Sequence, residues 1–414
     1  MRGSPVQDDS VPDLLQPRLR HGLWEFPVHH MRGGTSTGLV IHDRIAPAEL
    51  ELKEELLRHL MGVPLEGEVA GNRQTTGLGR GPATSNKVFF ADMEDAEGGP
   101  RLVSTLAQLA ADHGRIDWSV NCGNMSSALQ LWAIDCGLAP FEPAGTHTLE
   151  IRNTNTGVLT TSRMVSVAGG GFVTADIPGV MGRHPAVDLF LHHPAGARTG
   201  ALLPTGSAVD VIDGVPVSCV DVAVPMVIAR AADFGKTAHE SIRDLAADEE
   251  FLRRFKNIWV QAGLRMKLRR KDGREMTEED IARSETVPKA CIIGAPRGTG
   301  DLSVRYLTPQ TVHGSMAVTG GCCLAAATLI PGSVAHDIAG KQAGPTDEEI
   351  QVGIENPAGV LGTTVVARMQ NGNLEIRSAA YQRSAQVLLA GYVPLYAPSR
   401  SLREALSASA TAFA

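Results

Sequence analysis

The sequence has few aromatic residues, no excess of positive charge and no long apolar run. Only 4% of its 414 residues are Phe, Trp or Tyr, whereas 44 are Gly and 24 are Pro. This composition favours short strands and tight turns over long helices, which indicates an α+β protein. A formal net charge of −7 argues against a nucleic-acid partner, because phosphate contacts need clustered Lys and Arg. No apolar run approaches a membrane span, so we expect no membrane partner.

The cysteines lack the spacing of a zinc site. There are six, at positions 122, 136, 219, 291, 322 and 323, with no CxxC pair and no His-rich motif beside them. We therefore expect no metal. Residues 1–21 are polar and contain prolines, without the apolar core of a secretion signal, so they predict a disordered lead-in. These features together favour a cytoplasmic protein with reduced thiols.

The length predicts two domains. We place an N-terminal domain at residues 22–205 and a C-terminal domain at 206–380, because turn formers gather near residues 195–207. Residues 381–400 are expected to return as a strand to the first domain, and residues 401–414 to form a tail. The spacing of apolar residues predicts helices at about 47–61 and 239–271.

A similar unit occurs in both halves of the chain. Cys122 in "NCGN" precedes an apolar helical segment that Gly137 can end, and Cys322 and Cys323 in "GGCC" open a second one. This repetition suggests two related halves.

Cys122 and Lys87 are the candidates for proton transfer. The N-terminus of a helix favours an anion, so a cysteine there could be partly thiolate and exchange a proton with a substrate. The alternative for Cys122 is an ordinary buried cysteine. Lys87 lies between a polar turn and a strand, where partial desolvation would make it a base, although a strand-edge lysine is more often solvated. Cys136, Cys219 and Cys291 lie in apolar runs and are predicted to be structural.

Six motifs in order resemble the 2-methylaconitate isomerase (PrpF) family over about residues 24–395. They are "MRGGTSTG" (31–38), "TSNKV" (84–88), "NCGN" (121–124), "LLPTG" (202–206), "HGSMAVTGGCCLAAATLIPGSV" (313–334) and "IENPAG" (354–359). Members include 4-oxalomesaconate tautomerases, aconitate Δ-isomerases and methylitaconate isomerases. The resemblance implies the diaminopimelate epimerase-like fold, in which two pseudo-symmetric domains each wrap a curved sheet around a central helix.

The resemblance also implies an isomerase that needs no metal, flavin, nicotinamide or pyridoxal phosphate. Such an enzyme moves a double bond in an unsaturated di- or tricarboxylate through a dienolate, with Lys87 and Cys122 as the catalytic pair. We expect the substrate's carboxylates to be held by turn and helix-start residues. These are Thr35, Ser36, Thr37, Ser85, Asn86, Gly123, Asn124, Met125, His313, Thr319, Gly320 and Gly321. For His313 a structural role between the domains is an equal alternative. A homodimer is also expected.

Two departures from the family's motifs bear on the substrate. Thr37 stands where the family usually has Lys, and Asn356 stands where it usually has His, with Ala358 in place of Ser. These changes leave two alternatives open. One is a two-cysteine racemase or epimerase of the same fold, in which Cys122 faces Cys322 or Cys323. The other is a protein that binds polycarboxylates without catalysis. The presence of Lys87 favours the isomerase.

Overall fold

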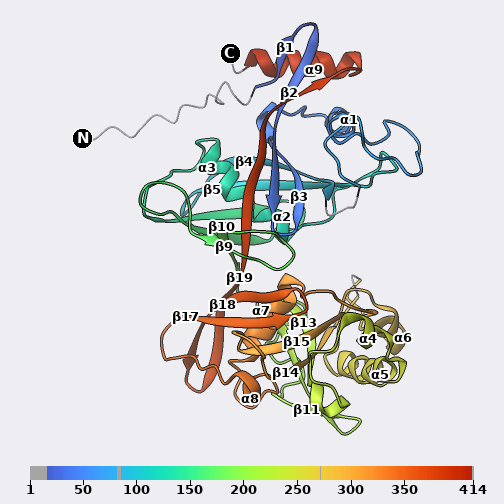
Figure 1. The fold of residues 1–414 in the computed structure, drawn as a ribbon, viewed down its shortest axis with the longest axis vertical. Coiled ribbons are helices and arrows are strands. Elements are labelled where there is room, and N and C mark those ends of the chain that lie inside the picture. Colours follow the sequence, from blue (N-terminus) through green and yellow to red (C-terminus); the bar gives the residue numbers. More distant parts are fainter. Residues whose placement is uncertain (1–15, 82–84, 271, 413–414) are drawn as a thin grey trace. The chain divides into compact units, whose positions relative to one another are not determined.

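The computed structural model describes residues 16–81, 85–270 and 272–412, and Figure 1 shows their path. The chain divides into two compact units. Unit 1 contains the chain up to Ala175, the segment Arg183–Val187 and everything from Arg383 onward. Unit 2 contains Asp176–Gly182 and Asp188–Gln382.

The turn-rich segment 195–207, chosen from the sequence as the domain boundary, lies inside unit 2. The carboxylate of Asp221, a fully buried residue, holds this segment in place. Its Oδ2 accepts hydrogen bonds from the backbone N–H groups of Arg198 at 2.9 Å and Thr199 at 2.8 Å. A stretch with the composition of a linker is therefore an ordered loop of the second unit.

Unit 1 is built from a mixed sheet and four α-helices among the described residues. The strands are β1 (Arg18–Arg20), β2 (Leu23–Gly33), β3 (Ser36–His42), β4 (Lys87–Ala96), β5 (Gly99–Leu109), β6 (Ile116–Asp117), β7 (Thr146–Asn153), β8 (Leu159–Val165) and β9 (Thr174–Ala175). The helices are α1 (Leu50–Met61), α2 (Gly123–Ser126), α3 (Leu129–Asp135) and α9 (Arg400–Ala412). Parts of β10 (His184–His192) and β19 (Asn373–Leu395) complete the unit.

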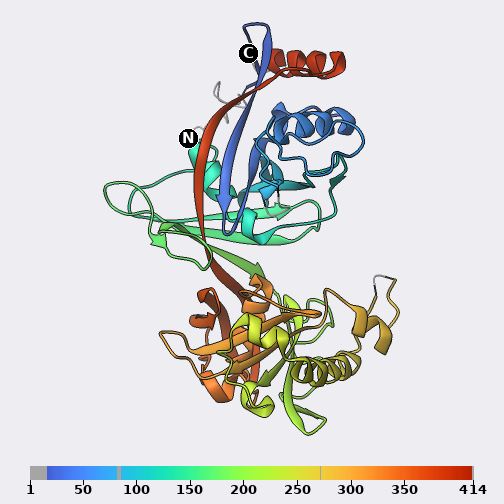
Figure 2. The ribbon, with the colours of Figure 1, turned by 45° about the vertical axis from the view of Figure 1, so that its right-hand side comes forward.

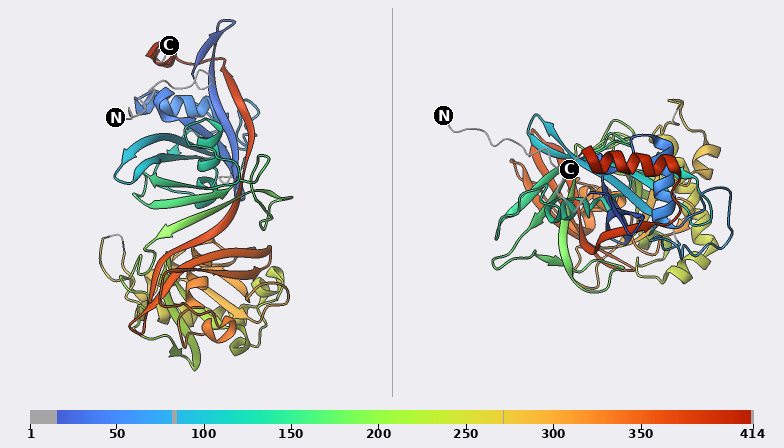
Figure 3. Two further views of the ribbon diagram at one scale, coloured as in Figure 1. Left: turned by 90° about the vertical axis from the view of Figure 1, so that its left-hand side faces the viewer. Right: turned by 90° about the horizontal axis from the view of Figure 1, so that it is seen from above.

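The strands of unit 1 alternate between hairpins and parallel crossovers. β2 and β3 are antiparallel, β3 runs parallel to β4, β4 and β5 are antiparallel, β5 runs parallel to β7, and β7 and β8 are antiparallel. Helix α1 makes the first crossover, and α2 with α3 makes the second. β2 pairs with β3 along one edge and with the C-terminal part of β19 along the other, as Figure 3 shows for the blue and red strands.

Unit 2 repeats this succession. Its strands are β11 (Asp210–Ile212), β12 (Val215–Val222), β13 (Val224–Arg230), β14 (Lys289–Gly294), β15 (Leu302–Thr308), β16 (Thr311–Val312), β17 (Glu348–Asn356) and β18 (Gly359–Gln370). Its helices are α4 (Ile242–Ala247), α5 (Glu249–Arg265), α6 (Glu278–Arg283), α7 (Val318–Ala327) and α8 (His336–Ala339). Hairpin β12–β13, parallel pair β13–β14, hairpin β14–β15, parallel pair β15–β17 and hairpin β17–β18 follow the order seen in unit 1. The α+β class is confirmed, and the two halves share one topology.

In each unit the sheet has a helix packed on either side. In unit 1, buried leucines of α1 and α9 form one core cluster with the sheet, while Trp132 of α3 packs edge-on against His29 of β2 and His42 of β3. In unit 2, α5 covers one side of the sheet (Figure 2). Its Phe255 and Trp259 belong to the core cluster on that side. All but the first two residues of α7 are buried against the other side.

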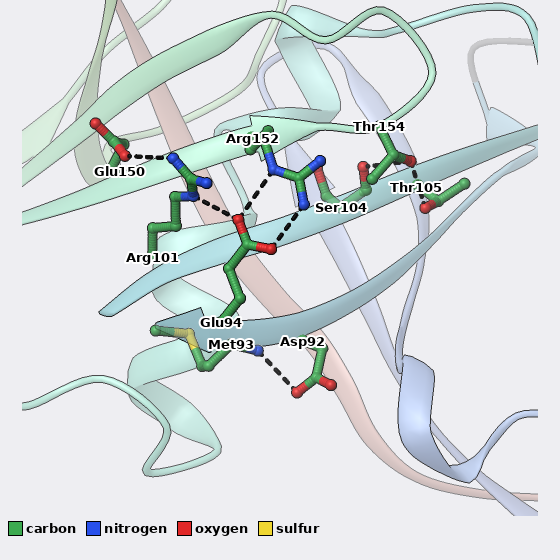
Figure 4. A network of polar contacts seen from close by, with 9 residues as sticks. All are labelled: Asp92, Met93, Glu94, Arg101, Ser104, Thr105, Glu150, Arg152 and Thr154. Atoms are coloured by element: carbon green, nitrogen blue, oxygen red, sulfur yellow. Dashed lines mark hydrogen bonds and ion pairs between the residues drawn. The ribbon is translucent and has the colours of Figure 1, made fainter. Parts of the chain in front are cut away.

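A polar network joins three neighbouring strands of unit 1 (Figure 4). Glu94 of β4 accepts two hydrogen bonds from Arg152 of β7, at 2.9 and 2.7 Å, and a third from Arg101 of β5. Arg101 also approaches Glu150 at 3.4 Å. The hydrogen bonds from Arg152, followed by those from Arg101, lower the pKa of Glu94 to about 2. The network therefore holds the strands together with an ionised carboxylate.

Two predicted helices are interrupted. The helix expected at 239–271 is divided into α4 and α5, because Asp248 ends one helix and caps the next by accepting a hydrogen bond from Phe251 N at 2.9 Å. The helix expected between Cys122 and Gly137 is divided into α2 and α3. Ser127 lies at the break, and its hydroxyl bonds back to Asn124 O at 2.7 Å.

Both ends of the chain differ from the prediction. The lead-in was expected to extend to residue 21, yet Arg18–Arg20 pair with β2 as strand β1, while residues 1–15 lie outside the described part of the chain. The predicted tail at 401–414 contains most of helix α9. Leu402 and Leu406, one turn apart on this helix, are fully buried in the core cluster that includes α1. They therefore pack α9 onto unit 1.

Candidate active site

Lys87 is the first residue of β4 and lies against β3. In the parallel register it stands opposite Gly38, where an added Cβ would come within 2.3 Å of Lys87 O. The glycine therefore lets the two strands approach. Lys87 is only 4% exposed, and burial lowers the pKa of its amine, an effect that the nearby Cys122 partly offsets. A buried amine of this kind loses its proton more readily than a solvated one.

Cys122 caps the N-terminus of α2. Its Sγ accepts a hydrogen bond from Met125 N at 3.5 Å, while its own backbone N–H donates to Asn121 Oδ1 at 2.7 Å. The hydroxyl of Ser36 lies 3.8 Å from the sulfur. The thiol is half-buried and interacts electrostatically with Lys87. Unit 1 thus brings an amine, a thiol and a hydroxyl together.

Strand alternation separates Thr37 from these groups. Ser36 approaches Cys122, and Gly38 faces Lys87, so these two residues of β3 share one face of the sheet. Side chains alternate between faces along a strand, which directs Thr37 to the opposite face. Its hydroxyl is buried and has no hydrogen-bond partner among the described residues. We therefore remove Thr37 from the expected substrate contacts.

Asn86, predicted to hold a carboxylate, has a different task in the structure. Its side chain is fully buried and forms a reciprocal pair with the amide of Gln74, with two hydrogen bonds of 3.0 Å. Its Oδ1 also accepts from Arg80 N at 3.1 Å, and its Nδ2 donates to Gly81 O at 3.0 Å. All of its hydrogen-bonding positions are used. Asn86 therefore ties the start of β4 to Gln74, Arg80 and Gly81.

The remaining unit 1 candidates divide between exposed and buried groups. Thr35 is exposed, and Gly123, Asn124 and Ser85 are half-buried. Thr84, which belongs to the motif of Ser85, lies outside the described residues. The side chain of Met125 is fully buried, so only its backbone N–H, already directed at Cys122, belongs to the site.

Close packing against Asn124 accounts for the two glycines of the β2–β3 turn. A Cβ at Gly33 would come within 2.5 Å of Asn124 O, and one at Gly34 would come equally close to Asn124 Oδ1. The double glycine of "MRGGTSTG" therefore lets the β2–β3 turn lie against the α2 segment.

In unit 2 the candidates gather at the start of α7. Thr319 is half-buried, whereas Gly320 and Gly321 are buried. An added Cβ would lie 2.6 Å from the ring of Tyr306 at Gly320, and 2.5 Å from Leu361 at Gly321. Both glycines are therefore needed for packing α7 against the sheet.

His313 is held in a defined tautomer. The backbone N–H of Ser315 donates to His313 Nδ1 at 2.9 Å, so in the neutral ring the proton is on Nε2. The hydroxyl of Ser315 donates to Asn356 Oδ1 at 3.2 Å, which also accepts from Ala358 N at 3.0 Å. Asn356, the residue that departs from the family's motif, thus supports the turn that orients His313.

The other cysteines are poor candidates for chemistry. Cys322 and Cys323 lie in the second turn of α7, which begins at Val318, and both are fully buried. The prediction that they open this helix is therefore wrong. Burial raises the pKa of Cys323 well above its ordinary value, and it raises the pKa of Cys136 and Cys219 to about 12.

Two residues near the site were missed in the sequence. Gln74 pairs with Asn86, as described above, and Arg383 donates from Nε to Asn124 Oδ1 at 2.8 Å. Neither lies in any of the six motifs. The contact of Arg383 joins residues 259 positions apart, so no local pattern could have indicated it.

Among the described residues, no group of three or more His, Cys, Asp or Glu side chains is arranged to hold a metal ion. None of the described helices is both long enough and apolar enough to span a membrane.

Comparison with known proteins identifies relatives along most of the chain. The family described as "PrpF protein" matches residues 24–396. The chain is 32% identical over 378 residues to the 4-oxalomesaconate tautomerase of Pseudomonas putida, covering 90% of this chain and 96% of that one. It is 31% identical over 379 residues to the (4E)-oxalomesaconate Delta-isomerase of Novosphingobium sp. strain KA1, covering 91% and 99%. The crystal structure of a methylitaconate-delta-isomerase superposes with a TM-score of 0.74 at 26% identity, covering 92% of this chain and 97% of that chain.

Proposed function

Because the chain belongs to the PrpF family, we propose that it is an isomerase that moves a carbon–carbon double bond within a small unsaturated polycarboxylate. The observation that carries this proposal is the pair formed by Lys87 and Cys122. A buried amine with a lowered pKa, interacting with a half-buried thiol, provides a base and an acid in the same part of unit 1. The relatives named above are isomerases and tautomerases, which supports the same reaction class.

In the proposed reaction Lys87 is the base. Its neutral amine takes a proton from an sp³ carbon next to the double bond, and the C–H electron pair forms a dienolate with a carboxylate or keto group. The dienolate then takes a proton at the carbon two positions away, either from the thiol of Cys122 or from the lysine ammonium. If the thiol gives the proton, the resulting thiolate receives the proton of Lys87. Atoms and charge balance, and the isomerisation has no net oxidation or reduction.

The hydroxyl of Ser36 would stabilise this cycle. At 3.8 Å from Cys122 Sγ it is placed to donate to the sulfur when the thiol has lost its proton. The backbone N–H of Met125, 3.5 Å from the same sulfur, would act in the same sense.

The two-thiol racemase is a weaker candidate. It needs Cys322 or Cys323 as a second acid or base, but both are fully buried in the second turn of α7. Cys323 donates to Val220 O at 3.4 Å, and burial raises the pKa of this thiol. A thiol that remains protonated cannot serve as a base.

The experiment that tests the proposal is proton NMR in D2O. The protein is incubated separately with 4-oxalomesaconate, 2-methylaconitate, cis-aconitate and methylitaconate. We expect at least one acid to show a shift of its olefinic signals together with deuterium at the carbon that gains a proton. Binding without exchange at any carbon would favour the non-catalytic alternative. Deuteration of an amino acid at its α-carbon alone would favour the racemase.

The cytoplasmic location stays a prediction from the sequence. The homodimer and the absence of a nucleic-acid partner stay predictions, which light scattering and a nucleic-acid binding assay would test.

A further inference from the structure

Arg383 reaches the candidate site of unit 1 from the far end of the chain. It lies on the part of β19 that belongs to unit 1, is 7% exposed, and donates from Nε to Asn124 Oδ1 at 2.8 Å. Gly34 leaves room for this contact, because a Cβ at that position would lie 2.5 Å from Asn124 Oδ1 and 3.0 Å from Arg383 Cδ. A buried guanidinium thus contacts the residue two positions after Cys122.

This contact determines which way the amide of Asn124 points. A guanidinium only donates hydrogen bonds, so the oxygen of the amide must face Arg383 and its NH2 group must face away. Accordingly, Asn124 Nδ2 donates to the hydroxyl of Thr35 at 3.2 Å. Because the Thr35 oxygen accepts this bond, its own O–H is left to donate elsewhere. Arg383, Asn124 and Thr35 therefore form a directed chain of donors.

The chain ends in groups suited to a carboxylate. Thr35 is exposed and Asn124 is half-buried, so the donors at this end can meet a small molecule. Both lie next to catalytic candidates, since Thr35 precedes Ser36, and Asn124 follows the cap of α2 that Cys122 forms.

We propose that Arg383 is the positioning residue of a carboxylate subsite whose ligands are Asn124 and Thr35. This inference rests on the proposed function. It assigns to the subsite a carboxylate of the unsaturated polycarboxylate that takes no part in the proton transfer to Lys87. The subsite binds this group equally in the substrate and in the dienolate. Its loss should therefore raise KM with little change in kcat.

The sharpest variant is Asn124→Asp. Aspartate has the same shape and keeps an oxygen for Arg383, but its second oxygen replaces the NH2 group and repels a carboxylate. We expect the protein to stay folded and KM to rise about tenfold or more, the scale of a lost hydrogen bond to a charged group. An unchanged KM would overturn the proposal.

A matched pair at Thr35 tests the outer donor. Thr35→Ser keeps the hydroxyl and should have nearly the KM of the wild type, whereas Thr35→Val removes it and should raise KM. Equal KM values for the two variants would contradict the subsite. Arg383→Met frees the amide of Asn124 to rotate and should raise KM as Asn124→Asp does. A fall in kcat with KM unchanged would instead show that Arg383 acts only on the fold or the proton transfer.

Binding without turnover separates this inference from the proposed function. Propane-1,2,3-tricarboxylate is saturated and cannot undergo allylic isomerisation, so calorimetry reports its affinity directly. We expect weaker binding to Asn124→Asp and Thr35→Val and wild-type binding to Thr35→Ser. If these differences are seen but no acid is isomerised, the proposed function fails and the subsite stands. If isomerisation is seen and the four proteins bind equally, the subsite fails. If Arg383→Met does not fold, the other three variants decide the question.

Discussion

Replacing Lys87 with Met tests the proposed base most directly. Lys87 is 4% exposed, and burial lowers the pKa of its amine, so the folded protein bears a cost for enclosing this group. Methionine has a similar length and no charge, and the space beside Gly38 is unchanged. We therefore expect the melting temperature to stay the same or rise. General-base catalysis contributes about 10² to 10⁴ to the rate, so kcat should fall by at least about a hundredfold.

The repeated topology supplies a matched control, Lys289→Met. Lys289 begins β14 as Lys87 begins β4, and each of these strands runs parallel to the second strand of a hairpin. Burial lowers the pKa of Lys289 too, and its Nζ donates to Glu285 O at 3.3 Å. Yet no interaction with a thiol contributes to its pKa. Lys289→Met should therefore keep activity close to that of the wild type.

The assay is NMR in D2O combined with the dependence of kcat/KM on pH. Lysine acts as a base only when neutral, so kcat/KM should rise with pH. The midpoint of this rise should lie below 10.5, the ordinary pKa of lysine. Lys87→Met should show neither this rise nor deuterium at the carbon that exchanges its proton. A loss of less than about tenfold, well below the 10² to 10⁴ that a general base contributes, would refute the reasoning. Equal losses in Lys87→Met and Lys289→Met would do so as well.

The remaining predictions concern reactivity, stability and packing. Iodoacetamide at neutral pH should modify the half-buried Cys122 faster than Cys323, whose pKa is raised by burial. Propane-1,2,3-tricarboxylate should protect Cys122 from this reaction. Mass spectrometry of the labelled peptides would show the opposite order if Cys122 were inaccessible. Glu94 has a pKa lowered to about 2, so its pairing stabilises the fold above the unfolded value of 4.5 and loses this effect as the pH falls through about 2. Because Glu94 and its two arginine partners are partly exposed, Glu94→Gln should cost about 1 kcal/mol of stability at pH 7. Denaturant titrations of this variant should show a smaller loss of stability between pH 4.5 and 2 than those of the wild type. The same dependence of stability on pH in both proteins would exclude this role. Gly320→Ala would place a Cβ 2.6 Å from the ring of Tyr306 and should cost about 1 to 3 kcal/mol, although alanine favours a helix; a stabilised variant in thermal unfolding would show that α7 can shift freely.

Local patterns were sufficient to predict much of the fold. Apolar spacing placed a helix at 47–61, and the structure has α1 at Leu50–Met61. Gly33 and Gly34 lie where β2 ends and the turn to β3 begins, and paired glycines are a common turn signal. These signals depend on neighbours in the sequence, which determine both helical periodicity and turn geometry.

Features that depend on distant contacts were not predictable. The helix after Cys122 breaks because the hydroxyl of Ser127 bonds to a carbonyl, an option that a serine has at many positions where it is not used. Helix α9 is stabilised by Leu402 and Leu406, which are buried in the same core cluster as the leucines of α1. Asn86 has its structural role because the fold brings Gln74, which lies 12 positions earlier, beside it.

The two units share one strand order but differ at the start of the helix of the second crossover. Each unit places a lysine at the start of the crossover strand, β4 or β14, and packs a helix on the sheet by the second crossover. In unit 1 the residue that caps this helix is Cys122, half-buried and interacting with Lys87. In unit 2 the cap is Ala317, and the nearest thiols lie in the second turn, fully buried. A shift of one helical turn thus moves a cysteine from the start of the helix into the core. Since burial keeps such a thiol protonated, the described residues of unit 2 do not provide both groups of the proposed proton transfer. The reaction proposed here therefore uses the amine and the thiol of unit 1 rather than two thiols.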